Sequence, residues 1–328
     1  MQLGRRVRHV SRVHRQEGVL AVIWEFLFQA FKPFLRVYEW SLWHWYMKRR
    51  RNSFHVVGSE MTVLSADRGV SRELAVHRIH EPLATLLLQQ YLKPGMTAVD
   101  VGSNIGYYAL LESRLVEPGG RVIAIEPVPR NFEQLRLNIR NNARMNVHVN
   151  QLAIADRNGT LPIYLSARSN WHSLLPTPSS KTCTVTVSTL DAFLSGFELN
   201  SVDFIRMDLE GYEIQVIKGM RRILELYRPH LLIELHPDLV GPDATIDYLR
   251  TLEEFGYAPQ FVFEQERDYA IRWKFVKPEH PSMRELMRHP LIVRDQRALT
   301  AFFSCDSRPE LLTSPSIFFE RAQQLLPT

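Results

Sequence analysis

One segment constrains the fold of this chain more than any other: an apolar run, then a glycine-spaced turn, then a helical pattern. The run Thr97–Val101 predicts a short buried strand, and the spacing Asp-x-Gly-x-x-x-Gly follows over residues 100–106. Glycines there let the backbone turn tightly and approach a ligand at the carboxyl end of a strand. A second apolar run, Arg121–Ile125, ends in Glu126, an acid placed to bond ribose hydroxyls. The pattern predicts a nucleoside-containing cofactor.

The residues of the turn distinguish between nucleoside cofactors. A dinucleotide fingerprint has a middle glycine where this chain has Asn104, between Gly102 and Gly106. Asp100 precedes the turn, and a carboxylate there suits a cationic amino-acid moiety better than a diphosphate. These residues favour S-adenosylmethionine over NAD, and a tight turn without a ligand is the alternative.

Acidic residues follow two further apolar runs. Asp208 and Glu210 follow the run at 202–207. Glu234 lies near the end of the run at 230–235, and His236 follows it. Strands of an open α/β sheet bring such residues to the edge where ligands bind, so all four are candidates for catalysis. Acids also favour the first turn of a helix, so Asp208 or Glu210 as a helix cap is the alternative.

Strand and helix patterns alternate along the chain, which is typical of a parallel sheet with helices on both faces. The prediction is an α/β fold, with a doubly wound, mostly parallel seven-stranded Rossmann-like sheet. The predicted strands are 97–101, 121–125, 146–150, 202–207, 230–235, 258–264 and 299–304, with an added pair at 161–165 and 182–187. The predicted helices are 82–92, 106–116, 129–142, 212–224 and 243–255.

The first 51 residues differ from the rest in charge. They hold 11 of the Lys and Arg residues and three acids, a net charge of +8 in a chain whose net charge is +5. Ten aromatic residues lie between 24 and 46, and the polar residues from Glu25 to Glu39 form one stripe of a helix with a wide apolar face. Pro33 is expected to kink this helix or begin a second one. The arm therefore lies in a membrane interface, on the domain, or on another subunit.

The domain prediction is an amphipathic arm over 1–52, a catalytic domain over 53–305 with its core at about 77–263, and a tail over 306–328. Cys183 and Cys305 form no motif, which fits free thiols in a reducing compartment. The predicted location is cytoplasmic, with peripheral attachment at the inner face of the membrane as the alternative. Because the basic charge belongs to the arm, no nucleic-acid partner is expected.

These motifs together resemble the FkbM-type branch of the class I S-adenosylmethionine-dependent methyltransferases. The similarity spans about residues 77 to 263, with Ser103 in place of the usual alanine and a loop at 169–173 that is only partly family-like. The matching blocks are Glu81-Pro82, Lys93–Gly95, Val99–Tyr108, Ile125–Pro127, Ala153–Asp156, Ser188–Asp191 and Met207–Glu213.

The resemblance implies O-methylation of a hydroxyl on a sugar or polyketide, with N-methylation as an alternative and a lipid-linked saccharide as an acceptor if the arm lies on a membrane. It also implies that Glu81 contributes to cofactor binding. Asp156 is expected to approach the adenine or to cap a turn. The other functional classes are a non-catalytic cofactor-binding module on a membrane and, less favoured, a nucleic-acid methyltransferase.

No resident metal is predicted. His77 and His80 form one pair without further ligands. A divalent cation, Mg²⁺ or Ca²⁺, held by the oxygens of Asp208, Glu210 and Glu234 is the less favoured alternative.

Overall fold

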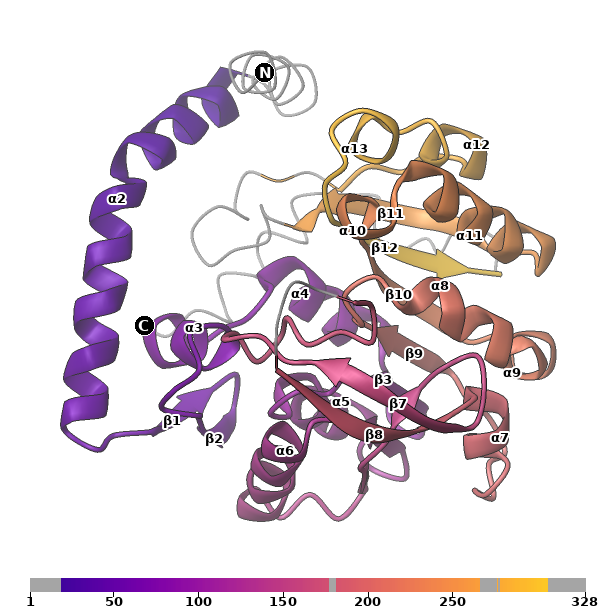
Figure 1. Cartoon of the computed structure of the whole chain (residues 1–328), viewed down its shortest axis with the longest axis horizontal. Coiled ribbons are helices and arrows are strands. Elements are labelled where there is room, and N and C mark those ends of the chain that lie inside the picture. Colours follow the sequence, from indigo (N-terminus) through magenta and orange to yellow (C-terminus); the bar gives the residue numbers. More distant parts are fainter. Residues whose placement is uncertain (1–18, 177–180, 266–275, 277, 306–328) are drawn as a thin grey trace.

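A seven-stranded sheet forms the centre of the protein (Figure 1). The computed structural model describes residues 19–176, 181–265, 276 and 278–305. In the order of the sheet, the strands are β11 (Ala258–Glu264), β12 (Leu299–Ser304), β10 (His230–Leu235), β9 (Phe204–Met207), β3 (Thr97–Val101), β4 (Arg121–Ile125) and β5 (Val147–Asn150).

Six of the seven strands share one direction. β9 and β4 pair with β3 in parallel, and β12 alone runs antiparallel to its neighbours β10 and β11. After β3 the chain moves outward to β4 and β5, and then returns to the other side of β3 to form β9. The strand order therefore reverses beside β3, and ligands bind at the carboxyl ends of the strands at such a switch point.

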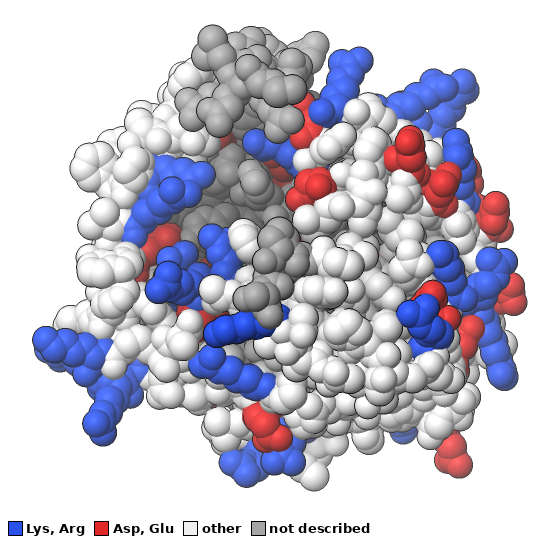
Figure 2. Space-filling model, viewed as in Figure 1, with Lys and Arg blue, Asp and Glu red and all other residues white. Residues whose placement is uncertain are grey.

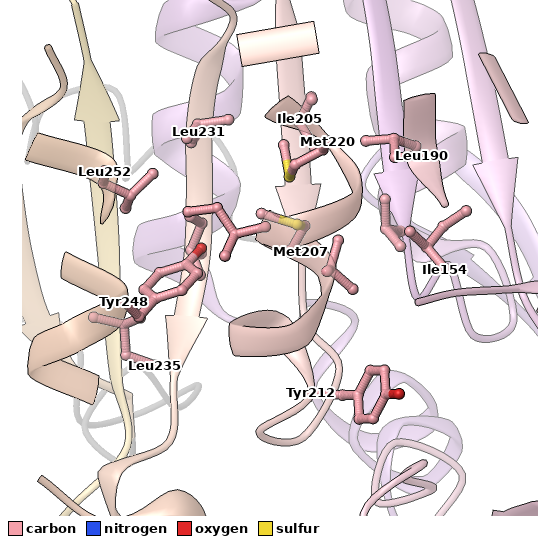
Figure 3. Packing of buried hydrophobic residues seen from close by; sticks show 14 of the residues in the cluster. Ile154, Leu190, Ile205, Met207, Tyr212, Met220, Leu231, Leu235, Tyr248 and Leu252 are labelled. Carbon is pink, nitrogen blue, oxygen red and sulfur yellow. The ribbon is translucent and has the colours of Figure 1, made fainter. Parts of the chain in front are cut away.

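Alternate residues of the central strands pack into two separate cores, one on each face of the sheet. Val99, Ile205 and Met207 belong to one core (Figure 3), which also holds Tyr248 and Leu252 from α11 (Pro242–Glu254). The other core is formed with α3 (Val70–His77), α4 (Pro82–Tyr91), α5 (Tyr107–Val116) and α6 (Pro129–Asn141). Because both faces are covered, the predicted doubly wound α/β sheet is confirmed.

The predicted boundaries match the structure at most strands and fail at one helix. The expected helix over 212–224 is wrong: the chain forms α8 (Glu213–Val216), a 3-10 turn (Ile217–Gly219) and α9 (Arg221–Leu226). Gly219 lies so close to Thr189 and to the backbone of Ala155 that no Cβ fits there. The helical pattern is interrupted at this closely packed glycine.

A small second sheet contributes Ile163, Val185 and Val187 to the core that contains Val99. The predicted added pair forms β7 (Gly159–Tyr164) and β8 (Thr182–Ser188), and β6 (Ala153–Ile154), which was not predicted, pairs with β8. The remaining elements are a hairpin of β1 (Ser53–Val56) and β2 (Ser59–Thr62) and the helices α7 (Leu190–Leu194), α10 (Pro237–Val240), α12 (Met283–Leu286) and α13 (Pro290–Val293).

The arm forms one helix, α2 (Val19–Lys48), which is curved in Figure 1 and continues through Pro33, so no second helix begins there. Its polar stripe faces inward in part: Glu25 and Glu39 are buried, and Nε2 of His77 in α3 lies 2.9 Å from Oε1 of Glu39. Trp43 is also buried. The end of the arm therefore packs on the domain.

The opposite side of α2 is apolar and exposed. The exposed apolar face of α2 consists of side chains that are 45% to 72% exposed: Val19, Ile23, Phe26, Leu27, Phe31, Phe34, Val37, Tyr38, Trp40 and Trp45. Within the described ranges, no helix combines the length and apolar character that crossing a bilayer requires.

One buried side chain connects the β1–β2 hairpin to the glycine turn. Asn138 in α6 is fully buried, and its Nδ2 donates to the carbonyl of Thr62 at 3.0 Å and to the carbonyl of Ile105 at 2.8 Å. Its Oδ1 accepts the Thr62 backbone N–H at 2.9 Å. Three backbone groups thus depend on one amide.

We expect Asn138→Ala to lower the free energy of unfolding by about 2–4 kcal/mol, because each buried group left without a partner costs about 1–3 kcal/mol. Urea denaturation followed by circular dichroism measures the difference. Asn141→Ala, an exposed position on the same helix, is the matched control and should change stability by less than about 0.5 kcal/mol. Equal effects of the two substitutions would contradict the role given to Asn138.

Candidate active site

The glycine turn is held against both neighbouring strands. Gly102 has a φ of 91°, and its backbone N–H donates to the carbonyl of Ile125 at 3.0 Å. A Cβ at Gly102 would lie 2.4 Å from the backbone oxygen of Asp208. Only glycine therefore allows the turn after β3 to touch the residue that follows β9.

Glu126 closes the turn from the side of β4. Its carboxylate accepts the backbone N–H of Asn104 and that of Val128, each at 2.9 Å. Burial raises the pKa of Glu126 to about 7, although both hydrogen bonds act to lower it. The carboxylate is thus positioned before any ligand binds.

A cavity of about 580 Å³, measured with its open mouth, lies at this edge of the sheet. Among the predicted site residues, Gly102, Asn104, Glu126 and Asp208 line it. The wall also includes residues that the sequence analysis did not identify: Ile154, Ile163, Asn170, His172, Leu209 and Tyr212. A mostly apolar wall with a few fixed polar groups is typical of a small-molecule site.

The other predicted cofactor residues do not line this cavity. Gly106 precedes α5 with a φ of 95°, and Asp100 is fully buried behind the turn. Asp156 lies outside the wall, beside the turn Asp156–Gly159, and Glu81 borders two other hollows. Glu81 and Asp156 therefore do not contribute to the wall of this cavity.

Arg206 on β9 lies between two of the predicted acids, Asp100 and Asp208. It was not among the predicted site residues. Its guanidinium lies 3.3 Å from Oδ1 of Asp100 and 2.9 Å from Oδ2 of Asp208. Burial alone would lower the pKa of Arg206, but the charges of Asp208 and Asp100 outweigh it and raise that pKa well above its ordinary value. A fixed positive charge therefore lies between the two strand ends.

Glu81 belongs to a second buried network beneath the same edge. The Tyr108 hydroxyl donates to Oε2 of Glu81 at 2.6 Å, and His80 Nε2 lies 3.4 Å from Oε1. Burial acts to lower the pKa of His80, but Glu81 and Glu73 together raise it to about 9. The ionised partners hold the pKa of Glu81 below its ordinary value despite burial.

Three of the four candidate catalytic residues, Asp208, Glu234 and His236, come together at the ends of β9 and β10. Ligand atoms of Asp208, Glu234 and His236 all lie within 4.8 Å of one another. Burial and the charge of Asp208 raise the pKa of Glu210 and of Glu234 well above the ordinary carboxyl value. Burial lowers the pKa of His236, so its imidazole is neutral near pH 7.

A wider hollow of about 910 Å³, open to solvent, lies next to the cavity and shares Asn170 with it. Three arginines and one indole line it, with the guanidinium of Arg168 3.9 Å from the ring centre of Trp171. Figure 2 shows Lys and Arg side chains gathered in the hollowed region between α2 and the domain. Asp67 anchors the loop by accepting both the N–H and the hydroxyl of Ser169 at 2.8 Å.

The arrangement places a cavity, fixed hydrogen-bond acceptors and a group of acids at one edge. Residues 100–259 match the methyltransferase FkbM domain. The chain is accordingly an FkbM-type methyltransferase, and S-adenosylmethionine is its cofactor.

Three relatives match stretches of different length. A protein-L-isoaspartate O-methyltransferase of Triticum aestivum is 33% identical over 27% of the chain and 36% of its own length. The hexuronic acid methyltransferase AglP of Haloferax volcanii is 27% identical over 44% of the chain, which spans 58% of that relative. The 2-O-methyltransferase NoeI of Sinorhizobium fredii is 26% identical over 62% of the chain and 88% of its own length.

Among solved structures, a methyltransferase FkbM from Methylobacillus flagellatus is similar with a TM-score of 0.41 and 19% identity. The similarity covers 70% of this chain and 49% of that one.

The raised pKa of Glu126 predicts that the affinity for the cofactor depends on pH. A carboxylate accepts ribose hydroxyls better than a neutral acid, so affinity for S-adenosylhomocysteine should be full above pH 7 and fall as the acid is protonated below it. From about pH 8 to about pH 6 the Kd should rise roughly tenfold. Isothermal titration of the wild type and Glu126→Gln tests this, and the variant should bind more weakly with little change over the same range. A variant with the wild-type pH profile would show that another group titrates.

Proposed function

We propose that this FkbM-type methyltransferase transfers the methyl group of S-adenosylmethionine to a hydroxyl of a sugar acceptor. The observation that carries the proposal is the position of Asp208, which lines the cavity at the glycine turn and belongs to the group of acids beside it. The adenosine is assigned to the cavity between the glycine turn and Tyr212, with its ribose on Glu126. The methionine end then points toward Asp208.

The acceptor is assigned to the hollow beside the cavity. Its lining offers Trp171 and the guanidinium groups of Arg68, Arg72 and Arg168. Guanidinium groups suit carboxylate or phosphate oxygens, so a saccharide that carries an acidic group fits this lining. The hexuronic acid named for one relative has the same chemistry.

Methyl transfer to a hydroxyl needs a group that accepts the hydroxyl proton. Among the four candidates, Asp208 already forms an ion pair with Arg206. Glu210 has a φ of 52° and a carboxyl whose pKa is raised by burial and by Asp208. Burial lowers the pKa of Arg168 while Glu210 opposes this, so Glu210 lies within electrostatic reach of the acceptor hollow.

In this assignment the acceptor oxygen attacks the methyl carbon as the bond to sulfur breaks, and its proton passes to Glu210. The sulfonium charge disappears during transfer, so the protein contributes mainly by holding the two reactants at near-attack distance. Glu210 is fixed for this task because the Ser173 hydroxyl donates to its backbone carbonyl at 3.0 Å.

Transfer of tritium from labelled S-adenosylmethionine to glycans tests the proposed function. Acidic saccharides should be labelled by the purified protein, and neutral ones should be labelled less. Tight binding of S-adenosylhomocysteine without transfer to glycan, lipid or protein fractions would favour a non-catalytic module. A folded sample that binds NAD and no S-adenosylhomocysteine would be at odds with the family assignment.

Removing the proposed base should affect turnover far more than binding. We expect Glu210→Gln to lower kcat about 10²-fold or more while the Kd for S-adenosylhomocysteine changes less than about threefold. Asp208→Asn should also lower kcat, because the ion pair with Arg206 weakens. Glu254→Gln, an exposed position on α11, is the control. If Glu210→Gln and Asp208→Asn both keep wild-type turnover, the base is Glu234 or His236.

We also propose that the exposed apolar face of α2 lies on an anionic membrane surface. Lys48 and the three arginines after it adjoin this face, and residues 1–51 carry a net charge of +8. In Figure 2 the outer side of α2 is mostly white, with Lys and Arg side chains at its lower end. Burial of apolar side chains and attraction of basic residues to anionic lipid act together in such helices.

Substitutions test this better than truncation, because Trp43 packs on the domain and a shortened chain would lose that contact. We expect Phe31→Ser/Phe34→Ser/Val37→Ser to reduce co-sedimentation with phosphatidylserine vesicles at least about tenfold, because each lost apolar contact weakens binding. Added salt should weaken the binding of the wild type without abolishing it.

The control for the arm is Met145→Ser/Leu226→Ser, which removes exposed apolar side chains elsewhere in the domain. It should bind vesicles as the wild type does. Full-length protein that ignores vesicles and forms a stable dimer would instead identify the face as a subunit interface.

A further inference from the structure

Three side chains of metal-ligating type converge at the ends of two neighbouring parallel strands. Asp208 follows β9, Glu234 lies within β10, and His236 follows β10. One ligand atom from each lies within 4.8 Å of the other two. A cation bound at about 2.1 Å to each ligand holds neighbouring ligand atoms about 3 to 4 Å apart, so the spacing is close to that of a coordination sphere.

The hydrogen bonds of these groups leave ligand atoms available. Oδ2 of Asp208 is engaged by Arg206 at 2.9 Å, whereas its Oδ1 is buried without a hydrogen-bond partner in the described part of the chain. The same holds for Nε2 of His236, whose side chain is only 5% exposed. Oε1 of Glu234 lies 3.7 Å from that nitrogen, too far for a hydrogen bond.

A buried nitrogen and a buried carboxylate oxygen without partners are costly in a folded protein. Among the described surroundings, Arg206 already faces Asp100 and Asp208, and His80 faces Glu81. Glu81 and Glu234 border the same small cavity of about 190 Å³ as Arg206. A bound cation would give both orphaned atoms a partner and offset the surplus of carboxylates.

We propose that Asp208, Glu234 and His236 bind a divalent cation. Two carboxylates with one imidazole suit Mn²⁺, Fe²⁺, Co²⁺ or Zn²⁺ better than Mg²⁺ or Ca²⁺, which prefer oxygen ligands alone. This ligand set differs from the sequence expectation of no resident metal and from its less favoured all-oxygen alternative, because His236 takes the place of Glu210.

The location links the cation to the proposed methyl transfer, and this part of the inference rests on the proposed function. Asp208 lines the cofactor cavity on one side and the small cavity with Glu234 on the other. A cation there can coordinate the acceptor oxygen and lower the pKa of its hydroxyl. The proton would then pass to Glu210 more readily.

Titration with Mn²⁺ tests the site without any turnover. The full-length protein is dialysed against a chelator and then against buffer. It should then bind one Mn²⁺ per chain, and the loss of the free-ion signal in electron paramagnetic resonance measures this binding. His236→Gln and Glu234→Gln should each raise the Kd for Mn²⁺ at least about tenfold. His148→Gln, on an exposed strand position, is the control and should bind as the wild type does.

Thermal unfolding and titration with S-adenosylhomocysteine separate the possible failures. Mn²⁺ should raise the Tm of the wild type and leave that of the folded His236→Gln protein unchanged. Folded wild type that binds S-adenosylhomocysteine but no Mn²⁺ would overturn the metal site and leave the methyltransferase intact. Unchanged Mn²⁺ binding in both ligand variants would overturn the assignment of the ligands. Mn²⁺ binding at the site by protein that transfers no methyl group would support the site and count against the proposed function.

Discussion

The buried guanidinium of Arg206 is the contact on which the geometry of this site depends. It lies between a carboxylate on β3 and another that follows β9, the two strands at which the sheet reverses its order. Without a positive charge, two carboxylates at adjacent strand ends would repel each other in a low-dielectric interior. Removing one partner of such a buried pair typically costs about 3–5 kcal/mol, because the remaining charge is left uncompensated. The ion pairs thus keep the cofactor turn and the acidic residues in register.

The same cation cannot neutralise every acid around it. Glu81 is stabilised in its ionised form by His80, Arg206 and the Tyr108 hydroxyl, beneath the sheet edge. Among the described residues, Glu210 and Glu234 have no comparable partners, and their pKa values rise with burial and the charge of Asp208. The edge therefore contains two kinds of carboxylate. One kind has partners that fix its charge, and the other gains a proton or a cation most readily, as a reaction that removes a proton requires.

The sequence predicted the fold closely because each central strand is a continuous apolar run ended by a turn. The seven strands and the doubly wound arrangement are confirmed, as are the family and the cofactor. Arg206 was missed because a lone arginine within an apolar run forms no spacing pattern. Its role depends on its ion pair with Asp100, which lies on another strand. Asn138 was missed for the same reason, since its partners lie far away in the chain. The roles assigned to the individual site residues remain predictions.

The arm shows where periodicity stops being informative. A stripe of polar residues on a helix predicts two faces, but the choice of which face meets the domain depends on the partners that the domain offers. Here His77 provides a partner for Glu39. Trp43, about one helical turn further along α2, is also buried. Part of the polar stripe is therefore buried with partners, and most aromatic side chains of α2 are exposed. An exposed apolar surface of this kind is typical of a membrane or protein contact site, so the proposed membrane contact rests on the orientation of α2 together with the basic residues next to it.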